Sequence, residues 1–263
     1  MRMRRGHIAF AAILFFLILP NNLVAQKESP FIWSFAAQVG TDVGAPTPIP
    51  ISLIGGDYNP YPKILPSLGA RSTFRFREGW TFAAEVNYKT VAMIADARVE
   101  NQRMKGDSNN GDQYFTGTAY MESSATQLEV PLYAKYMIGK NRKHRVCVGG
   151  YYSYILDASF ISEARKGFVG AAPDSPDDVI TPATSRTMDF SASLSNWDAG
   201  ILIGYEIGIN SQLNLGLRVM AGVKDIFKTD SPFDYKMIPL RGTFVISFDL
   251  FEVRAGQGKR LVN

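Results

Sequence analysis

The sequence predicts an all-β chain that folds as an eight-stranded, up-and-down antiparallel barrel. Apolar and polar side chains alternate with a period of two along eight segments, and stretches with the period of a helix are absent after residue 25. The connections between these segments are alternately short and long, as in a barrel with turns at one end and loops at the other. The eight expected strands cover residues 31–39, 68–76, 80–88, 128–136, 146–154, 197–207, 213–219 and 244–250.

The first 25 residues have the features of a secretory signal peptide. Three arginines lie among the first five residues, and an apolar run of twelve covers residues 8–19. Ala25 places a small side chain just before Gln26, as cleavage requires. A membrane anchor needs about 20 apolar residues, so we expect cleavage between Ala25 and Gln26 and export of the mature chain.

The amino-acid composition excludes some classes of protein and argues against others. With 46% hydrophobic and 12% aromatic residues, the chain is not intrinsically disordered. Without the three signal arginines, 25 basic residues face 24 acidic ones, which gives no support to nucleic-acid binding. The single cysteine, Cys147, excludes an intramolecular disulfide; within a strand pattern we expect it to be a core residue and not a nucleophile.

We expect one barrel domain over residues 26–251, followed by a short periplasmic tail over residues 252–263. The Pro- and Gly-rich connection 40–67 predicts an irregular loop. Connection 90–125 contains Asn110-Gly111, a strong hairpin signal, so the strands on either side of it are expected to continue as a ribbon.

The polar face of the strands is predicted to point inward. It carries Gly149, Gly200, Gly204 and Gly216, and small residues fit the tight interior of an eight-stranded barrel. The apolar face then points outward on every strand, which only lipid tolerates. A soluble lipocalin-like barrel with an apolar interior is the alternative. Aromatic residues near strand ends predict an interfacial girdle made of Trp33, Phe76, Trp80, Tyr136, Tyr205 and Phe251.

Charges of both signs collect on the predicted inner face, where each should be paired. The basic members are Arg71, Arg75, Lys135, Arg218 and Arg241, and the acidic members are Glu85, Glu129, Asp198, Glu206 and Asp249. Either a small polar pore or a side-chain plug would account for them, and for eight strands we favour the plug. A three-residue turn at Arg77-Glu78-Gly79 would set Phe76 opposite Trp80 and Arg71 opposite Glu85, which predicts an Arg71–Glu85 ion pair.

Groups for catalysis or metal binding are few. His144 is the one histidine after the signal and lies in a short turn without catalytic partners. Two acidic groups could hold Ca²⁺, but they lack the loop spacing of a dedicated site, so we expect solvated carboxylates. These groups are Asp107 with Asp112, and Asp174 with Asp177 and Asp178. We therefore expect no catalytic residue, no cofactor and no metal.

Three segments resemble the PorT-like outer-membrane β-barrel proteins. They are the Leu-Glu-Val-Pro-Leu strand within residues 126–136, the Val-Gly-Gly-Tyr-Tyr segment 148–152 and the Asp-x-Gly-x-x-x-Gly-x-Glu segment 198–206. The resemblance implies an eight-stranded barrel inserted in the outer membrane, and a few relatives act in secretion of cargo across it. Pro131 in mid-strand predicts a bulge. The Pro-rich first loop and the tail after Phe251 depart from the family.

These observations favour a small, non-enzymatic integral protein of the outer membrane of a Gram-negative bacterium, structural or partner-binding through its exposed loops. The alternatives are an accessory component of a protein-secretion system and a soluble lipocalin-like carrier. The expected partners are outer-membrane lipid, the barrel-assembly machinery during biogenesis, and a secretion-system or surface protein. We expect a monomer that binds no nucleic acid.

Overall fold

The computed structural model describes residues 31–49, 57–104, 111–139, 141–229, 231, 233, 235–254 and 258–261. The signal segment with Ala25 and Gln26, and the loop residues Asp107 and Asn110, lie outside the described residues. The chain divides into the units Met1–Pro30 and Phe31–Asn263, and all described residues belong to the second. The described part of the chain contains no helix that is long and apolar enough to cross a membrane.

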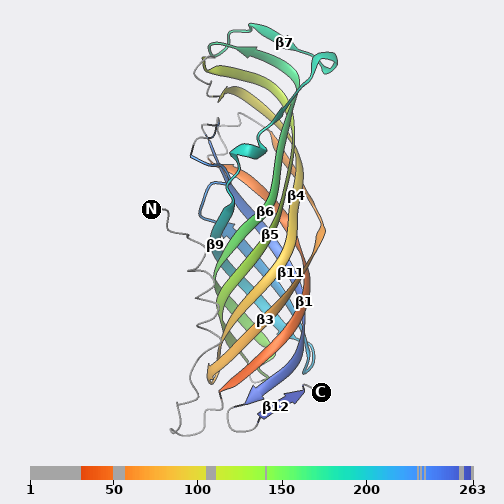
Figure 1. Cartoon of the computed structure of the whole chain (residues 1–263), viewed down its shortest axis with the longest axis vertical. Coiled ribbons are helices and arrows are strands. Elements are labelled where there is room, and N and C mark those ends of the chain that lie inside the picture. Colours follow the sequence, from red (N-terminus) through yellow and green to blue (C-terminus); the bar gives the residue numbers. More distant parts are fainter. Residues whose placement is uncertain are drawn as a thin grey trace, which may run out of the picture. The chain divides into compact units, whose positions relative to one another are not determined.

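Eight strands form a closed antiparallel ring, as predicted (Figure 1). Each strand pairs with the next along the ring, and pairing between the first and the last strand closes it. In ring order the strands are β1 (Ile32–Ile49), β3 (Leu65–Arg77), β4 (Trp80–Met104), β5 (Gln113–Ile138), β6 (His144–Gly170), β9 (Trp197–Gly208), β10 (Leu213–Gly222) and β11 (Lys236–Arg254).

Four short strands add to the ring from outside it. β2 (Tyr58–Lys63) pairs with β4, β7 (Asp178–Ile180) and β8 (Arg186–Asp189) pair with β6, and β12 (Gly258–Leu261) pairs with β11. Two 3-10 turns, Pro182–Thr184 and Ser191–Ser193, lie between β7 and β9. β11 thus runs three residues past Phe251, and part of the expected tail folds back on it as β12.

The expectation of an irregular first loop is wrong over its described parts. β1 continues to Ile49, with Pro46 opposite Pro239 of β11, and β2 occupies residues 58–63. β1 pairs with β3 only as far as Asp42, so the prolines beyond that point lie on a strand with one edge free of β3. Prolines are tolerated in such edge positions because no ladder hydrogen bond is lost there.

Three neighbouring strands continue well beyond the barrel. β4, β5 and β6 have 25, 26 and 27 residues, whereas about 9–11 residues suffice to cross a bilayer. They remain paired as far as Met104 opposite Gln113 and Tyr114 opposite Gly170. In Figure 1 they leave the barrel as a curved ribbon that carries β7. The ribbon predicted from Asn110-Gly111 is therefore present, and it includes β6 as a third strand.

Two local predictions of register have different outcomes. Gly79 has φ +80° in the β3–β4 turn, and a bulge there pairs Trp80 with Arg77 and leaves Phe76 unpaired; the predicted Phe76–Trp80 pairing is wrong. Beyond the bulge, Arg71 does lie opposite Glu85. The bulge expected at Pro131 is absent, because β4 and β5 keep one register on both sides of it, with Ala84 opposite Leu132 and Asn87 opposite Glu129.

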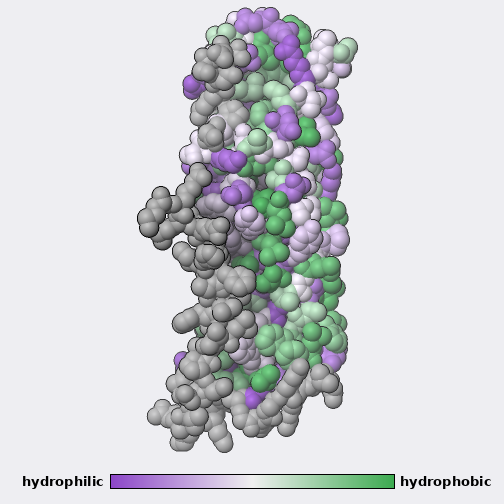
Figure 2. Space-filling view, in the orientation of Figure 1, coloured by the Kyte–Doolittle hydropathy of each residue, from purple (hydrophilic) through white to green (hydrophobic). Residues whose placement is uncertain are grey.

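The faces of the strands are as predicted. Leu132 and Ile203 are 54% and 58% exposed on the outside, whereas their neighbours Tyr133 and Leu202 are 3% and 0% exposed inside. Figure 2 shows hydrophobic side chains gathered over the barrel strands, and hydrophilic ones more frequent toward the end that carries β7. An apolar exterior around a charged interior is the reverse of a soluble lipocalin-like carrier, so that alternative is wrong.

Two rows of aromatic side chains border the apolar band. The predicted girdle lies at the short-turn end, where Trp80 pairs with Tyr136 and their ring centroids are 4.9 Å apart. A second row, not predicted, includes Tyr88, eight residues after Trp80, and Trp197, eight residues before Tyr205. Eight residues cover about 26 Å of strand. Because the strands are tilted by about 40° from the barrel axis, this length corresponds to about 20 Å along the axis. This separation is close to the apolar height of about 25 Å in outer-membrane barrels.

Candidate functional site

The lumen of the barrel is filled by paired charges. Three carboxylates, Glu85, Glu129 and Glu206, are almost completely buried along its length. Because an isolated buried charge costs several kcal/mol, each of them needs at least one cationic partner. Arginines and lysines on the inner faces of other strands supply these partners, and they divide the lumen into three levels.

The level nearest the short turns is centred on Glu206 of β9. Arg71 donates to it from β3 at 2.6 Å and Lys135 from β5 at 2.8 Å. Arg145, near the start of β6, contributes a third cation at 2.5 Å. Asp249 lies beside this level, accepting from Arg71 at 3.3 Å and from Asn214 at 2.9 Å. One carboxylate thus joins β9 to three other strands.

The middle level is centred on Glu85 of β4. Arg218 of β10 binds it with both terminal nitrogens, at 2.7 and 2.6 Å. Tyr133 donates its hydroxyl to the same carboxylate, and Gln38 donates an amide hydrogen at 3.0 Å. The predicted Arg71–Glu85 ion pair is therefore wrong: the two residues are opposite in register, but Arg71 binds Glu206 and Glu85 binds Arg218.

The third level is centred on Glu129 of β5, which Arg241 of β11 and Lys89 of β4 bind together. Lys89 also reaches Asp42 of β1 at 3.0 Å. Asp198 lies nearby and accepts from the Tyr151 hydroxyl at 2.8 Å. Lys89, Asp42 and Arg145 of the first level were not among the predicted charges, although Lys89 and Asp42 continue the inward alternation of their strands.

Each level contains one arginine–glutamate bond across a full diameter of the barrel. The bonds join Arg71 to Glu206, Arg218 to Glu85 and Arg241 to Glu129. In every case three strands separate the two residues in both directions around the ring. An arginine side chain can span the interior of so narrow a barrel, whose volume side chains fill. This arrangement gives a plug and not an open polar pore.

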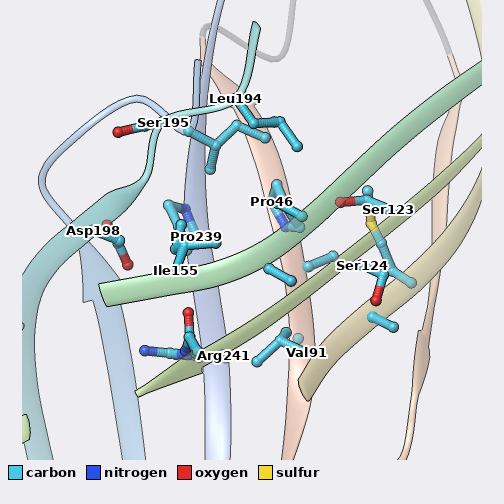
Figure 3. A pocket seen from close by; sticks show the side chains of 18 of the residues that line it. Pro46, Val91, Ser123, Ser124, Ile155, Leu194, Ser195, Asp198, Pro239 and Arg241 are labelled. Carbon is cyan, nitrogen blue, oxygen red and sulfur yellow. The ribbon is translucent and has the colours of Figure 1, made fainter. Parts of the chain in front are cut away.

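Beyond the third level lies an apolar cavity of about 70 Å³. Figure 3 shows Leu194 and Ser195 at one end of it and Val91 and Arg241 at the other. Two donors at its border, Nε of Arg241 and Nε2 of Gln127, have no hydrogen-bond partner among the described residues.

An apolar core closes the lumen beyond this cavity. Phe160 of β6 is completely buried at its centre. Phe227 and Phe233, from the connection between β10 and β11, pack against it with ring centroids 5.3 and 6.2 Å away. Met93 and Met121 of the extended β4 and β5 belong to the same cluster. Periodicity did not predict this core, because Phe160, Phe227 and Phe233 lie outside the expected strands and their contacts join segments distant in sequence.

The remaining predicted side chains lie apart from these levels. Arg75 faces the short-turn mouth of the lumen. His144 contacts the Tyr205 hydroxyl, and Cys147 is buried among apolar neighbours. Of the acidic residues, Asp112 binds Arg103 and Asp178 binds Arg186. Within the described ranges, no three side chains of the metal-binding types His, Cys, Asp and Glu lie together.

Residues 27–228 match the model of the outer membrane protein beta-barrel domain family. The chain belongs to this family. It is therefore a small outer-membrane β-barrel protein, and the family places it in the outer membrane of Gram-negative bacteria. No curated protein matches the chain.

The solved structures that are similar to this member of the family include three small outer-membrane proteins. Ail, the attachment invasion locus protein of Yersinia pestis, is 8% identical with a TM-score of 0.31, covering 83% of this chain and 97% of its own. OprG of Pseudomonas aeruginosa is 12% identical with a TM-score of 0.29, covering 86% and 95%. Neisserial surface protein A is 12% identical with a TM-score of 0.26, covering 83% and 99%.

Proposed function

We propose that this protein is a closed, non-catalytic barrel that holds a rigid protein-binding platform outside the cell. The platform is the extension of β4, β5 and β6 together with β7, β8 and the β10–β11 connection. The observation that carries the proposal is its buried core around Phe160, which continues past the membrane-spanning part of the strands. A loop that needed only to connect strands would not require such a core.

The orientation follows from the usual arrangement of outer-membrane barrels, with short turns in the periplasm and long loops outside. Lipid contacts the apolar band, and the plugged lumen leaves the extension as the surface available to partners. Folded loops bind with less loss of conformational entropy than flexible ones, which favours recognition of a macromolecular partner.

Site-specific cross-linking in intact cells tests this function. Cys147 is buried, so a thiol reagent will attack an engineered surface cysteine selectively. Val179 on β7 is exposed in the extension, and we expect Val179→Cys to give discrete protein adducts. The matched control is His144→Cys at the short-turn end. Adducts from both variants, or from neither, would contradict a partner-binding platform.

A second candidate function is an accessory part in protein secretion, acting at the periplasmic side. The strand β12, folded on the end of β11, is the observation that favours it, because it forms an ordered edge at the short-turn end. Copurification of secretion components with the wild type, and its loss when residues 255–263 are deleted, tests this candidate.

We further propose a family group, a signal-peptide cleavage site, domain boundaries and an assembly state for this protein. The segments 126–136 and 198–206 support membership of the PorT-like group. The charge and apolar pattern of residues 1–25 supports cleavage after Ala25 and export, leaving a barrel domain from residue 26 and a short C-terminal tail. We propose that the protein is a monomer assembled by the barrel-assembly machinery. Mass spectrometry of the mature N-terminus and of the native complex tests these assignments.

A further inference from the structure

We propose that the short-turn mouth of the lumen is a binding site for a small tetrahedral oxyanion such as inorganic phosphate or sulfate. The site is a cavity of about 130 Å³ between the Glu206 level and the turns. A water needs about 10–15 Å³ of such a cavity, so the volume accommodates an ion with four oxygens.

The charges that line the cavity favour an anion. Four cations, Arg71, Arg75, Lys135 and Arg145, face two carboxylates, Asp249 and Glu252. Three of the cations are bound to Glu206 deeper in the lumen. Asp249 accepts from Arg71, and Glu252 is paired with Arg254 at 2.5 Å.

Arg75 is the cation left over from these pairs. Among the described residues it makes no side-chain ion pair, and its Nε is buried without a partner. Glu252 attracts it, whereas Arg145, Arg142 and Arg254 repel it. Bringing an anion into this mouth would relieve that repulsion.

Hydrogen-bond donors converge on the same space. Thr81 lies opposite Arg75 in the β3–β4 register and is 6% exposed, and within the described part of the chain its hydroxyl has no partner. The Nε atoms of Arg71 and Arg145 are likewise buried and unpartnered. Buried donors are normally satisfied, and an oxyanion can accept from several donors at once through charge-assisted bonds.

Isothermal titration calorimetry tests the site. Sodium phosphate and sodium sulfate are titrated at low ionic strength into the mature protein, folded in octyl glucoside, a detergent without phosphate. We expect saturable binding of one ion per barrel. Arg75→Gln should weaken it at least tenfold, and Thr81→Val several-fold. The matched control is Arg77→Gln, which removes an exposed arginine two residues along the same strand.

Heat-modifiability gels establish that each variant is folded. Arg75→Gln strands no carboxylate because Arg75 holds none, and Thr81→Val changes little in volume, so at least one informative variant will remain folded. The absence of saturable binding to wild type would overturn the proposal. Equal weakening by Arg77→Gln and Arg75→Gln would also overturn it, because it would indicate general attraction to a cationic surface.

Discussion

Arg218 and Glu85 join opposite walls of the barrel through two hydrogen bonds, from Nη1 to Oε2 at 2.7 Å and from Nη2 to Oε1 at 2.6 Å. The strands that carry them, β10 and β4, are separated by three strands in both directions around the ring. Two further arginine–glutamate bonds repeat this geometry at other levels. Ion pairs thus connect opposite walls of the lumen at three levels, and we expect them to contribute to the stability of the barrel.

Removing one partner of this bond should be costly. We expect Glu85→Gln and Arg218→Met each to lower the free energy of unfolding by about 3–5 kcal/mol, because the remaining charge stays buried without its counter-ion. The double variant should lose clearly less than the sum. Denaturant unfolding in lipid vesicles, followed by tryptophan fluorescence, measures the cycle.

Two further double-mutant cycles provide controls for the coupling energy between Arg218 and Glu85. Arg71→Met combined with Glu85→Gln should show weaker coupling, since the two residues lie opposite in register but bind other partners. The exposed pair Lys63–Glu122, at 2.7 Å, should couple by about 0–1 kcal/mol. If Arg71 and Glu85 couple more strongly than Arg218 and Glu85, then Glu85 binds Arg71 on the neighbouring strand and not Arg218 across the lumen.

The lipid-facing band should reject charge. Leu132→Arg and Ile203→Arg should each destabilise the folded barrel by about 2–4 kcal/mol, because the new guanidinium would lie at mid-depth in hydrocarbon. Val179→Arg is the control, an equally exposed apolar side chain on β7 beyond the band. The amounts of heat-modifiable protein in the outer membrane report the effect. A loss with Val179→Arg as large as with Leu132→Arg would place β7 in the membrane.

The fold was predictable because every strand that crosses the membrane separates lipid from a packed lumen. That separation imposes strict alternation, which Leu132 and Tyr133 illustrate. The extensions of β4, β5 and β6 lie beyond this constraint, yet the alternation persists in places, as from Ala95 to Glu100 of β4, where Ala95, Ala97 and Val99 are buried. The core of the extensions around Phe160 depends on contacts between distant segments, which periodicity does not reveal.

Most members of the charge network were also predictable, whereas their partners were not. A turn fixes which residues are opposite on adjacent strands, and that reasoning placed Arg71 and Glu85 correctly in register. Partners across a diameter depend on how the closed ring is staggered, which no single hairpin specifies. Lys89 could have been found by continuing the alternation from Glu85, since both lie on the inner face of β4.

The extension should depend on Phe160. Phe160→Ala should cost about 3–5 kcal/mol within the extension, because Phe227 and Phe233 lose the ring on which they pack. Limited proteolysis should then cut the β10–β11 connection faster while the barrel stays heat-modifiable. Leu156→Ala, on the outer face of the same strand, is the control and should leave the cleavage rate unchanged. Equal cleavage rates in wild type and Phe160→Ala would show that the core does not hold this connection.

The orientation in the membrane is testable by epitope insertion. A tag between Met104 and Gln113, at the far end of the β4–β5 ribbon, should bind antibody on intact cells, and a tag after Asn263 should bind only after permeabilisation. An even number of strands returns the end of β11 to the side where β1 begins, and short turns face the periplasm. The reverse labelling would place the β4–β6 extension in the periplasm and remove the basis for an external platform.

Two barriers in the lumen should prevent the conduction of ions. The charge levels fill the barrel, and the core around Phe160 lies in series beyond them. Wild type should therefore show no steady conductance in planar bilayers. The Glu85→Gln, Arg218→Met double variant should also remain closed, because the apolar core is intact. Adding Phe160→Ala to it should raise conductance, since both barriers are then weakened. A steady current through wild type would show that the lumen is a pore, and a fully conducting double variant would show that the charges alone close it.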